Sequence, residues 1–288
     1  MAYLVHVAVL VGINAIVAIS LELLIGEVAL VCVAQAAFAA IGAYATTILL
    51  LQADMNFFVA AALGMLLSGT VALVLGAIFL RLKEVYYVLG TAGFNIIVWS
   101  ITLNWSSLTN GPMGIAGVPA PALFGFRISN NVQFLILVMV VLALVYALAQ
   151  LIKRSSFGRV LNAIREDEEA SAVFGYDAAR YKLMIFVISA ALAALGGAFF
   201  ASYITYIDPT SFTINYSIFL LAVVILGGLG SVRGAIVGAL ILVVLPEAFR
   251  FIGFPSDVAA QMRQVCYGLL LIFLMLYRPQ GILGTFKM

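Results

Sequence analysis

Charge is the scarcest property of this chain. Only 9% of its 288 residues are charged, whereas 65% are hydrophobic, and the formal net charge at pH 7 is +2. A soluble domain of this length could not cover its surface with so few charged side chains. So small a net charge also gives no basic surface for nucleic acid, and we expect no nucleic-acid partner. The composition therefore indicates a membrane protein.

Cysteine and histidine are almost as rare. Cys32 and Cys266 lie far apart in separate apolar runs, and neither belongs to a CxxC pair. The single histidine, His6, has no neighbour of metal-ligand type. We therefore expect no metal site, no catalytic residues and no cofactor bound by this chain. A membrane enzyme would need a convergent set of histidine, acidic or serine side chains, and one histidine contributes little to such a set.

Long apolar runs make up most of the chain. Runs of about 20 apolar residues span a bilayer as helices. Such runs occupy approximately residues 3–25, 29–53, 56–80, 85–103, 131–152, 183–206, 215–232, 234–252 and 262–277. They are continuously apolar and do not alternate, which argues against a transmembrane β-barrel. The pattern predicts an all-α polytopic membrane protein with about 8–9 transmembrane helices, some discontinuous, in a single domain covering residues 1–288.

Basic residues predict the orientation in the membrane. Loops rich in lysine and arginine stay in the cytoplasm. The basic residues crowd into the connector at 153–182, at Arg81 and Lys83, and near the C-terminus. We therefore expect the connector and the C-terminus in the cytoplasm and the N-terminus outside. Glu22 and Glu27 then lie near a cytoplasmic end, where we expect them at the membrane interface.

The connector at 153–182 is the longest strongly charged break in the apolar chain. Hydrocarbon cannot solvate its charges, so the connector lies in water beside the membrane. Apolar residues recur in a loose helical stripe from Arg159 to Phe174, and Gly175 supplies a helix stop. Two short helical segments are predicted here, through which a soluble partner could push on the membrane spans. A solvated juxtamembrane loop is the alternative that the residues alone leave open.

Polar residues and glycines interrupt several runs. Four glycines between residues 227 and 234 are poor helix formers and favour a real break in the last part of the chain. Polar groups at membrane depth are costly, so we expect some of them to line a substrate pathway. Interhelical hydrogen bonding or close packing is the commoner explanation for any one of them. The candidates are Gln35, Tyr44, Tyr86, Thr91, Gly93, Asn95, Gly227, Gly228, Gly230 and Ser231.

The connector also carries a family resemblance. Its segment FGRVLNAIREDE, residues 157–168, resembles the G-R-x-L-x-A-I-R-E-D-E segment of branched-chain amino-acid permeases. Glu169-Ala170-Ser171 followed by Gly175 resembles the EAA-x-x-x-G loop of ABC-importer permeases. Further blocks follow the family's order at 35–38, 41–44, 108–115, 227–231 and 245–247. Two departures stand out: Gln35 occupies a place where family members often have histidine, and Asn95 one where they often have glutamate.

The resemblance implies a permease subunit of an ATP-driven ABC importer for branched-chain or other neutral amino acids, and not an enzyme. Urea, short amides or small carboxylates stay open as substrates within the same family. The chain has no G-x-x-x-x-G-K-[ST] motif, so ATP and Mg belong on partner subunits. An ion-coupled secondary transporter is less favoured, because the acidic residues cluster at span ends and in the connector.

The resemblance also implies partners and coupling residues. The partners are a homologous second permease, two cytoplasmic ATPase subunits, an extracytoplasmic substrate-binding protein and membrane lipid, all at a bacterial inner membrane. The residues that would couple ATP hydrolysis to transport are Arg165, Glu166, Asp167, Glu169, Ala170 and Gly175.

Overall fold

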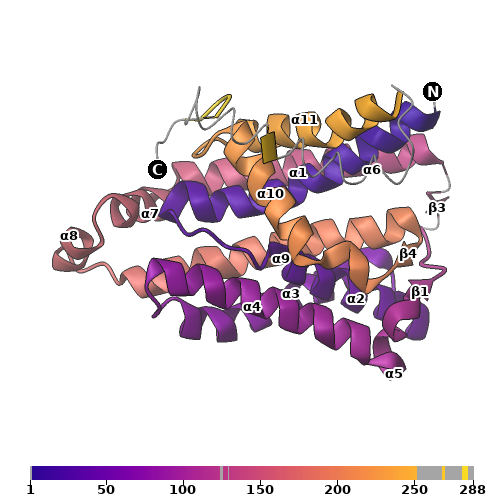
Figure 1. The fold of residues 1–288 in the computed structure, drawn as a ribbon, viewed down its shortest axis with the longest axis horizontal. Coiled ribbons are helices and arrows are strands. Elements are labelled where there is room, and N and C mark those ends of the chain that lie inside the picture. The colour runs from indigo at the N-terminus through magenta and orange to yellow at the C-terminus, as the bar shows by residue number, and fades with distance from the viewer. Residues whose placement is uncertain (1, 124–125, 129, 252–267, 270–280, 285–288) are drawn as a thin grey trace.

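The computed structural model describes residues 2–123, 126–128, 130–251, 268–269 and 281–284. Within these residues the fold is an all-α bundle whose long helices run along one common axis (Figure 1). Six helices are long and apolar enough to cross a membrane. They are α1 (Ala2–Val28), α2 (Gln35–Gln52), α3 (Phe57–Phe79), α4 (Glu84–Asn104), α6 (Asn131–Arg154) and α9 (Ala178–Ile204).

A bent pair of helices follows these six. It consists of α10 (Ile214–Gly227) and α11 (Val232–Phe251), with a bend of 119° across the break between them. The described residues therefore contain six candidate spans, or seven if the bent pair counts as one. This confirms the prediction of an all-α multispan protein with a discontinuous element. The predicted run 262–277 lies outside the described residues except for 268–269.

Short elements gather at the two ends of the bundle (Figure 1). One end, here called the connector end, carries α7 (Ser156–Glu166) and α8 (Glu168–Val173). At the opposite end, β1 pairs antiparallel with β4, and β2 pairs antiparallel with β3. The elements of that opposite end are α5 (Ser106–Thr109), η1 (Gly111–Met113), β1 (Ile115–Ala116), β2 (Ala122–Leu123), β3 (Phe126–Arg127), β4 (Tyr206–Ile207) and η2 (Pro209–Phe212).

The centre of the bundle consists of α1, α2 and α9, which are the most buried of the long helices. Small residues allow these helices to approach closely, as is usual between membrane helices. A Cβ atom at Gly42 of α2 would clash with the backbone of Ala194, and one at Gly197 of α9 would clash with the backbone of Ala39. The peripheral helices α3, α4 and α6 instead expose many large apolar side chains, as expected for surfaces that face lipid or another membrane protein.

Local signals explain where several of these helices begin. The side chain of Asn56 accepts a hydrogen bond from the Phe58 amide at 3.0 Å and caps α3. Asn130 caps α6 in the same way, by accepting from the Val132 amide at 3.3 Å. Such caps satisfy amide groups that the first helical turn leaves without partners. Both caps lie beside the ends of long apolar stretches, so they fix where those spans start.

The close approach of α2 and α9 yields a stability prediction. Gly197→Leu should lower the free energy of unfolding by about 3 kcal/mol, because α2 would have to move away to admit the new side chain. Gly93→Ala serves as the control, since apart from its chain neighbours and the backbone of its own helix no atom lies within 4 Å of the position that its Cβ would take. That change should be neutral or stabilising by up to about 1 kcal/mol. Thermal unfolding in detergent micelles measures both, and equal losses would contradict this packing.

Candidate functional site at the connector end

Two short helices form the connector because local residues start and stop them. Ser155 accepts a hydrogen bond from the Gly158 amide at 3.2 Å and caps α7. Asp167 accepts one from the Ala170 amide at 2.9 Å and caps α8. The chain then turns at Gly175, whose φ of 87° lies in the left-handed region that favours glycine. The two predicted helical segments are thus confirmed.

Helix α7 lies against the bundle on its apolar side. Leu161 and Ile164 are buried there, while Arg159 and Ala163 face outward. The ring of Phe157 stacks on that of Tyr181 at the start of α9, with 5.5 Å between the centroids. Helix α7 therefore packs against both the preceding span, α6, and the following span, α9.

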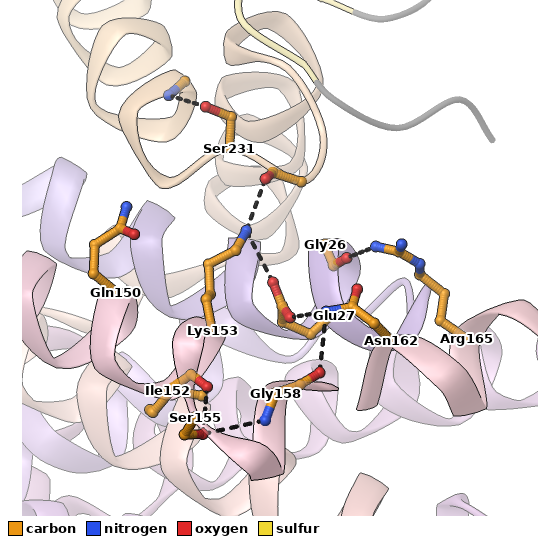
Figure 2. A network of polar contacts seen from close by, with 12 residues as sticks. Gly26, Glu27, Gln150, Ile152, Lys153, Ser155, Gly158, Asn162, Arg165 and Ser231 are labelled. Carbon is orange, nitrogen blue, oxygen red and sulfur yellow. Dashed lines mark hydrogen bonds and ion pairs between the residues drawn. The ribbon is translucent and has the colours of Figure 1, made fainter. Parts of the chain in front are cut away.

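A network of charged and polar contacts joins α7 to three other parts of the chain. Lys153, in the last turn of α6, forms an ion pair with Glu27 of α1, with 2.9 Å between Nζ and Oε1. The same ammonium donates to the carbonyl oxygen of Gly230 at 2.7 Å. Asn162 of α7 donates to the other oxygen of Glu27 at 2.9 Å. Figure 2 shows Lys153 reaching between Glu27 and the loop that carries Ser231.

Arg165 of α7 adds a further link to α1. Its guanidinium donates to the carbonyl oxygen of Gly26, in the last turn of α1 (Figure 2). The last carbonyls of a helix have no partner within the helix, so an arginine there satisfies one of them and interacts favourably with the helix dipole. We call Glu27, Lys153, Asn162, Arg165 and the carbonyls of Gly26 and Gly230 the connector-end network. It ties α1, α6, α7 and the α10–α11 break together.

The two acidic residues of α1 are enclosed by other parts of the chain, which the sequence did not predict. Glu22 and Glu27 are each only 1% exposed, so neither carboxylate lies on the surface of the protein. The carboxylate of Glu22 lies next to Gly26 and close to Gly230, and that of Glu27 is enclosed by Lys153 and Asn162. The reason is tertiary: α7 and the α10–α11 break, both distant in sequence, cover the end of α1.

Three of the predicted pathway residues meet around the non-helical link between α1 and α2. Gln35 donates to the hydroxyls of Ser20 at 2.9 Å and Ser189 at 2.7 Å. Asn95 donates to the hydroxyl of Ser217 at 2.9 Å, and Thr91 accepts from the Val33 amide at 3.2 Å. All of these side chains are buried. Their contacts join the link to α4, α9 and α10, which is the interhelical hydrogen bonding that polar residues within spans commonly provide.

The remaining pathway candidates are spread over the molecule. Tyr44 is buried in α2, whereas Tyr86 is 63% exposed on α4. Gly93 is partly exposed on α4, beside open space. Gly227, Gly228, Gly230 and Ser231 form the break between α10 and α11, which confirms the predicted interruption. The structure therefore places these candidates in three separate regions and not along one line.

An apolar cavity of about 280 Å³ lies between α3, α6 and α9. None of its lining residues is charged, so it offers no partner for the ammonium or carboxylate of an amino acid. No group of three or more metal-ligating side chains occurs within the described ranges. The lining residues are Phe57, Phe58, Ala61, Ala62, Met65, Val141, Leu144, Val145, Leu148, Leu192, Leu195 and Phe199.

Sequence reasoning missed an apolar tip at the end of α8. Val173 and Phe174 are 86% and 81% exposed, and Tyr176 lies just beyond them at 42%. The available signal was a pair of large apolar residues directly before the glycine that ends α8, on a helix too short to bury them. Exposed apolar side chains on such a protrusion are typical of a contact with another protein.

This arrangement defines a class of protein before any comparison: a multispan membrane protein whose water-exposed connector is tied to a broken pair of membrane helices. The chain belongs to the family described as the branched-chain amino acid transport system permease component, which matches residues 3–275. It is thus a permease component and not itself an enzyme.

Individual relatives support this family assignment. The chain is 32% identical to the high-affinity branched-chain amino acid transport system permease protein LivM of Salmonella typhimurium, over 97% of this chain and 69% of that protein. It is 26% identical to a probable LivM of Methanocaldococcus jannaschii, over 77% and 67% of the two chains. It is also 32% identical to the LivH permease protein of Salmonella typhimurium, over 63% and 59%. No solved structure matches the chain significantly.

The buried ion pair of the network predicts a non-additive mutational effect. Lys153→Met should destabilise the protein by about 3 kcal/mol, because it leaves the buried Glu27 carboxylate without its countercharge. Combining it with Glu27→Gln should recover most of that loss. Arg180→Met is the control, since its ion pair with Asp177 is largely exposed and worth less than about 1 kcal/mol. Thermal unfolding in micelles tests the cycle, and additive losses for the two network changes would refute it.

Proposed function

We propose that this chain is the permease subunit of an ATP-driven ABC importer for branched-chain or other neutral amino acids. Its family and the printed names of its relatives support both the transport class and the substrate class. The observation that supports the mechanism is the connector-end network. It joins α7 directly to membrane helices, so that a movement of α7 would also move them. We propose that the whole chain forms one transmembrane domain with the connector at 153–182 as its coupling element.

In this proposal two ATPase subunits bind ATP and Mg and dock on α7 and α8. Closure of the ATPase pair would displace the connector helices. Helix α7 is hydrogen-bonded to the end of α1, and Lys153 joins the end of α6 to the α10–α11 break. The displacement would therefore be transmitted to the spans through these contacts, and a flexible loop would not absorb it. A helix pair bent by 119° is suited to such a change, since a break absorbs rotation that a straight helix would resist.

The predicted coupling residues divide into two groups. Glu166, Glu169 and Ala170 are exposed on the connector, where we propose that they contact an ATPase subunit directly. The other three act on the shape of the connector: Arg165 bonds to α1, Asp167 caps α8, and Gly175 ends it. The exposed Phe174 would supply the apolar anchor of the interface, with the acidic residues around it as a polar rim.

The orientation and the substrate path complete the proposal. The connector end faces the cytoplasm, the N-terminus lies outside, and the opposite end receives substrate from a binding protein, in the inner membrane of a bacterium. We propose that Tyr86 and Gly93, on the outward side of α4, face the pathway shared with a homologous second permease. Gln35, Thr91 and Asn95 would position the link beside that pathway through the contacts they already make.

Reconstitution tests the proposed function. The chain would be co-purified with the products of neighbouring genes, placed in proteoliposomes, and assayed for ATP hydrolysis with leucine, alanine, urea or no addition. Stimulation by leucine or alanine supports the proposal in full. Stimulation by urea alone would preserve the importer but refute its substrate class. Uptake that follows an ion gradient without any ATPase would contradict the proposal as a whole.

The docking surface yields a separate prediction. Phe174→Ser and Glu169→Lys should each weaken binding of the ATPase subunits, by about tenfold or more, because one removes an apolar anchor and the other reverses a rim charge. Met113→Ser at the opposite end is the matched control, since Met113 is an apolar side chain almost as exposed as Phe174. Co-purification of the ATPase with each variant measures the effect. Unchanged recovery with Phe174→Ser would exclude this surface as the docking site.

A further inference from the structure

A second basic site lies on the exposed side of α6 and α11, beside the connector-end network. Arg233, in the first turn of α11, donates through Nε to the hydroxyl of Tyr146 on α6 at 3.1 Å. Gln150 donates to the same hydroxyl at 3.3 Å. Arg154 lies four residues beyond Gln150 on α6, so Tyr146, Gln150 and Arg154 share one face of that helix. The Arg233 guanidinium therefore bridges α11 to the face of α6 that also carries Arg154.

These two arginines have no countercharge among the described residues. The ion pairs there join Lys153 to Glu27, Arg165 to Glu166, Arg180 to Asp177 and Lys182 to Glu168. Arg154 and Arg233 take part in none of them, and both side chains are exposed. A third guanidinium, that of Arg159, donates to the backbone of Arg154 at 3.3 Å and adds to the positive charge. Like charges on one surface repel one another, and a bound anion would offset that repulsion.

The surface next to this charge is apolar and extends along both helices. On α11 the side chains at 237, 240 and 244 follow Arg233 at helical spacing, and Leu240 and Val244 are exposed. On α6 the exposed Met139 and Ala143 lie towards the middle of the span, before Tyr146, Gln150 and Arg154. The site is therefore basic at the membrane boundary and apolar within the membrane, which is the pattern of a phospholipid.

We propose that Arg154, Arg233 and Tyr146 bind the phosphate of an anionic phospholipid, whose acyl chains lie along the exposed faces of α6 and α11. Guanidinium groups match phosphate in charge and in hydrogen-bond geometry, and the tyrosine hydroxyl and the Gln150 amide add neutral partners. Basic pockets between membrane helices near the cytoplasmic boundary commonly bind such headgroups. The occupant is lipid because the same surface continues directly into side chains that face the hydrocarbon.

Native mass spectrometry of the full chain, purified with any subunits that accompany it, tests this site. The protein would be released from nanodiscs of phosphatidylethanolamine with phosphatidylglycerol, and retained lipids would be counted. The double variant Arg154→Gln/Arg233→Gln should lower retention of phosphatidylglycerol by about 30-fold, as expected for two basic residues near an anionic headgroup. Arg81→Gln/Lys83→Gln is the matched control, since it removes equal charge from exposed residues in the α3–α4 loop. Retention in that control should be unchanged.

A conservative variant separates a binding site from a folding effect. Arg154→Lys/Arg233→Lys keeps both charges and should retain phosphatidylglycerol far better than the glutamine pair. Equal retention of phosphatidylglycerol by the glutamine pair and by its matched control would overturn the proposal. It would be overturned equally if the wild-type protein retained the two lipids alike, or if the glutamine pair released a protein subunit instead of lipid. The last result would mark this face as a protein interface.

Discussion

The buried ion pair between Glu27 and Lys153 is the contact on which the connector end depends. A carboxylate that is only 1% exposed is stable as an anion only while its countercharge and hydrogen-bond donors stay in place. Lys153 supplies the charge and Asn162 supplies a donor, so neither α6 nor α7 can move away from α1 without a large electrostatic cost. The same ammonium also bonds to Gly230, which brings the broken helix pair under the same constraint.

The break itself depends on the absence of side chains. Gly227, at the end of α10, packs against the backbone of Gly234 in the first turn of α11. A Cβ atom at either glycine would clash with the backbone of the other. Gly228, at φ 109°, turns the chain in a conformation that residues with side chains rarely adopt, and the backbone of Leu283 donates to Gly227 at 2.9 Å. Small residues thus let the two helix ends of the break meet closely, and the backbone of Gly230 lies next to Gly26 of α1.

How much of this could be predicted from the sequence depends on whether the signal is local. The two connector helices were predictable because the charged break, the helical stripe and Gly175 all lie within one segment. The burial of Glu22 and Glu27 could not be predicted, because the residues that cover them are more than 100 positions away in the chain. Gln35, Thr91 and Asn95 were recognisable as unusual, but their partners on α1, α9 and α10 could not be inferred from periodicity. The exposed Phe174 was overlooked because apolar residues are expected to be buried.

The central claim is that α7, the end of α1 and α11 move as one body. The most direct test is a spin-label distance measurement on the assembled transporter, with and without trapped ATP. One label pair joins Ala163 on α7 to Leu240 on α11, and the other joins Ala163 to Leu82 in the α3–α4 loop, all three being exposed positions. The account predicts that ATP changes the second distance and leaves the first unchanged. A change in the Ala163–Leu240 distance as large as that to Leu82 would contradict it.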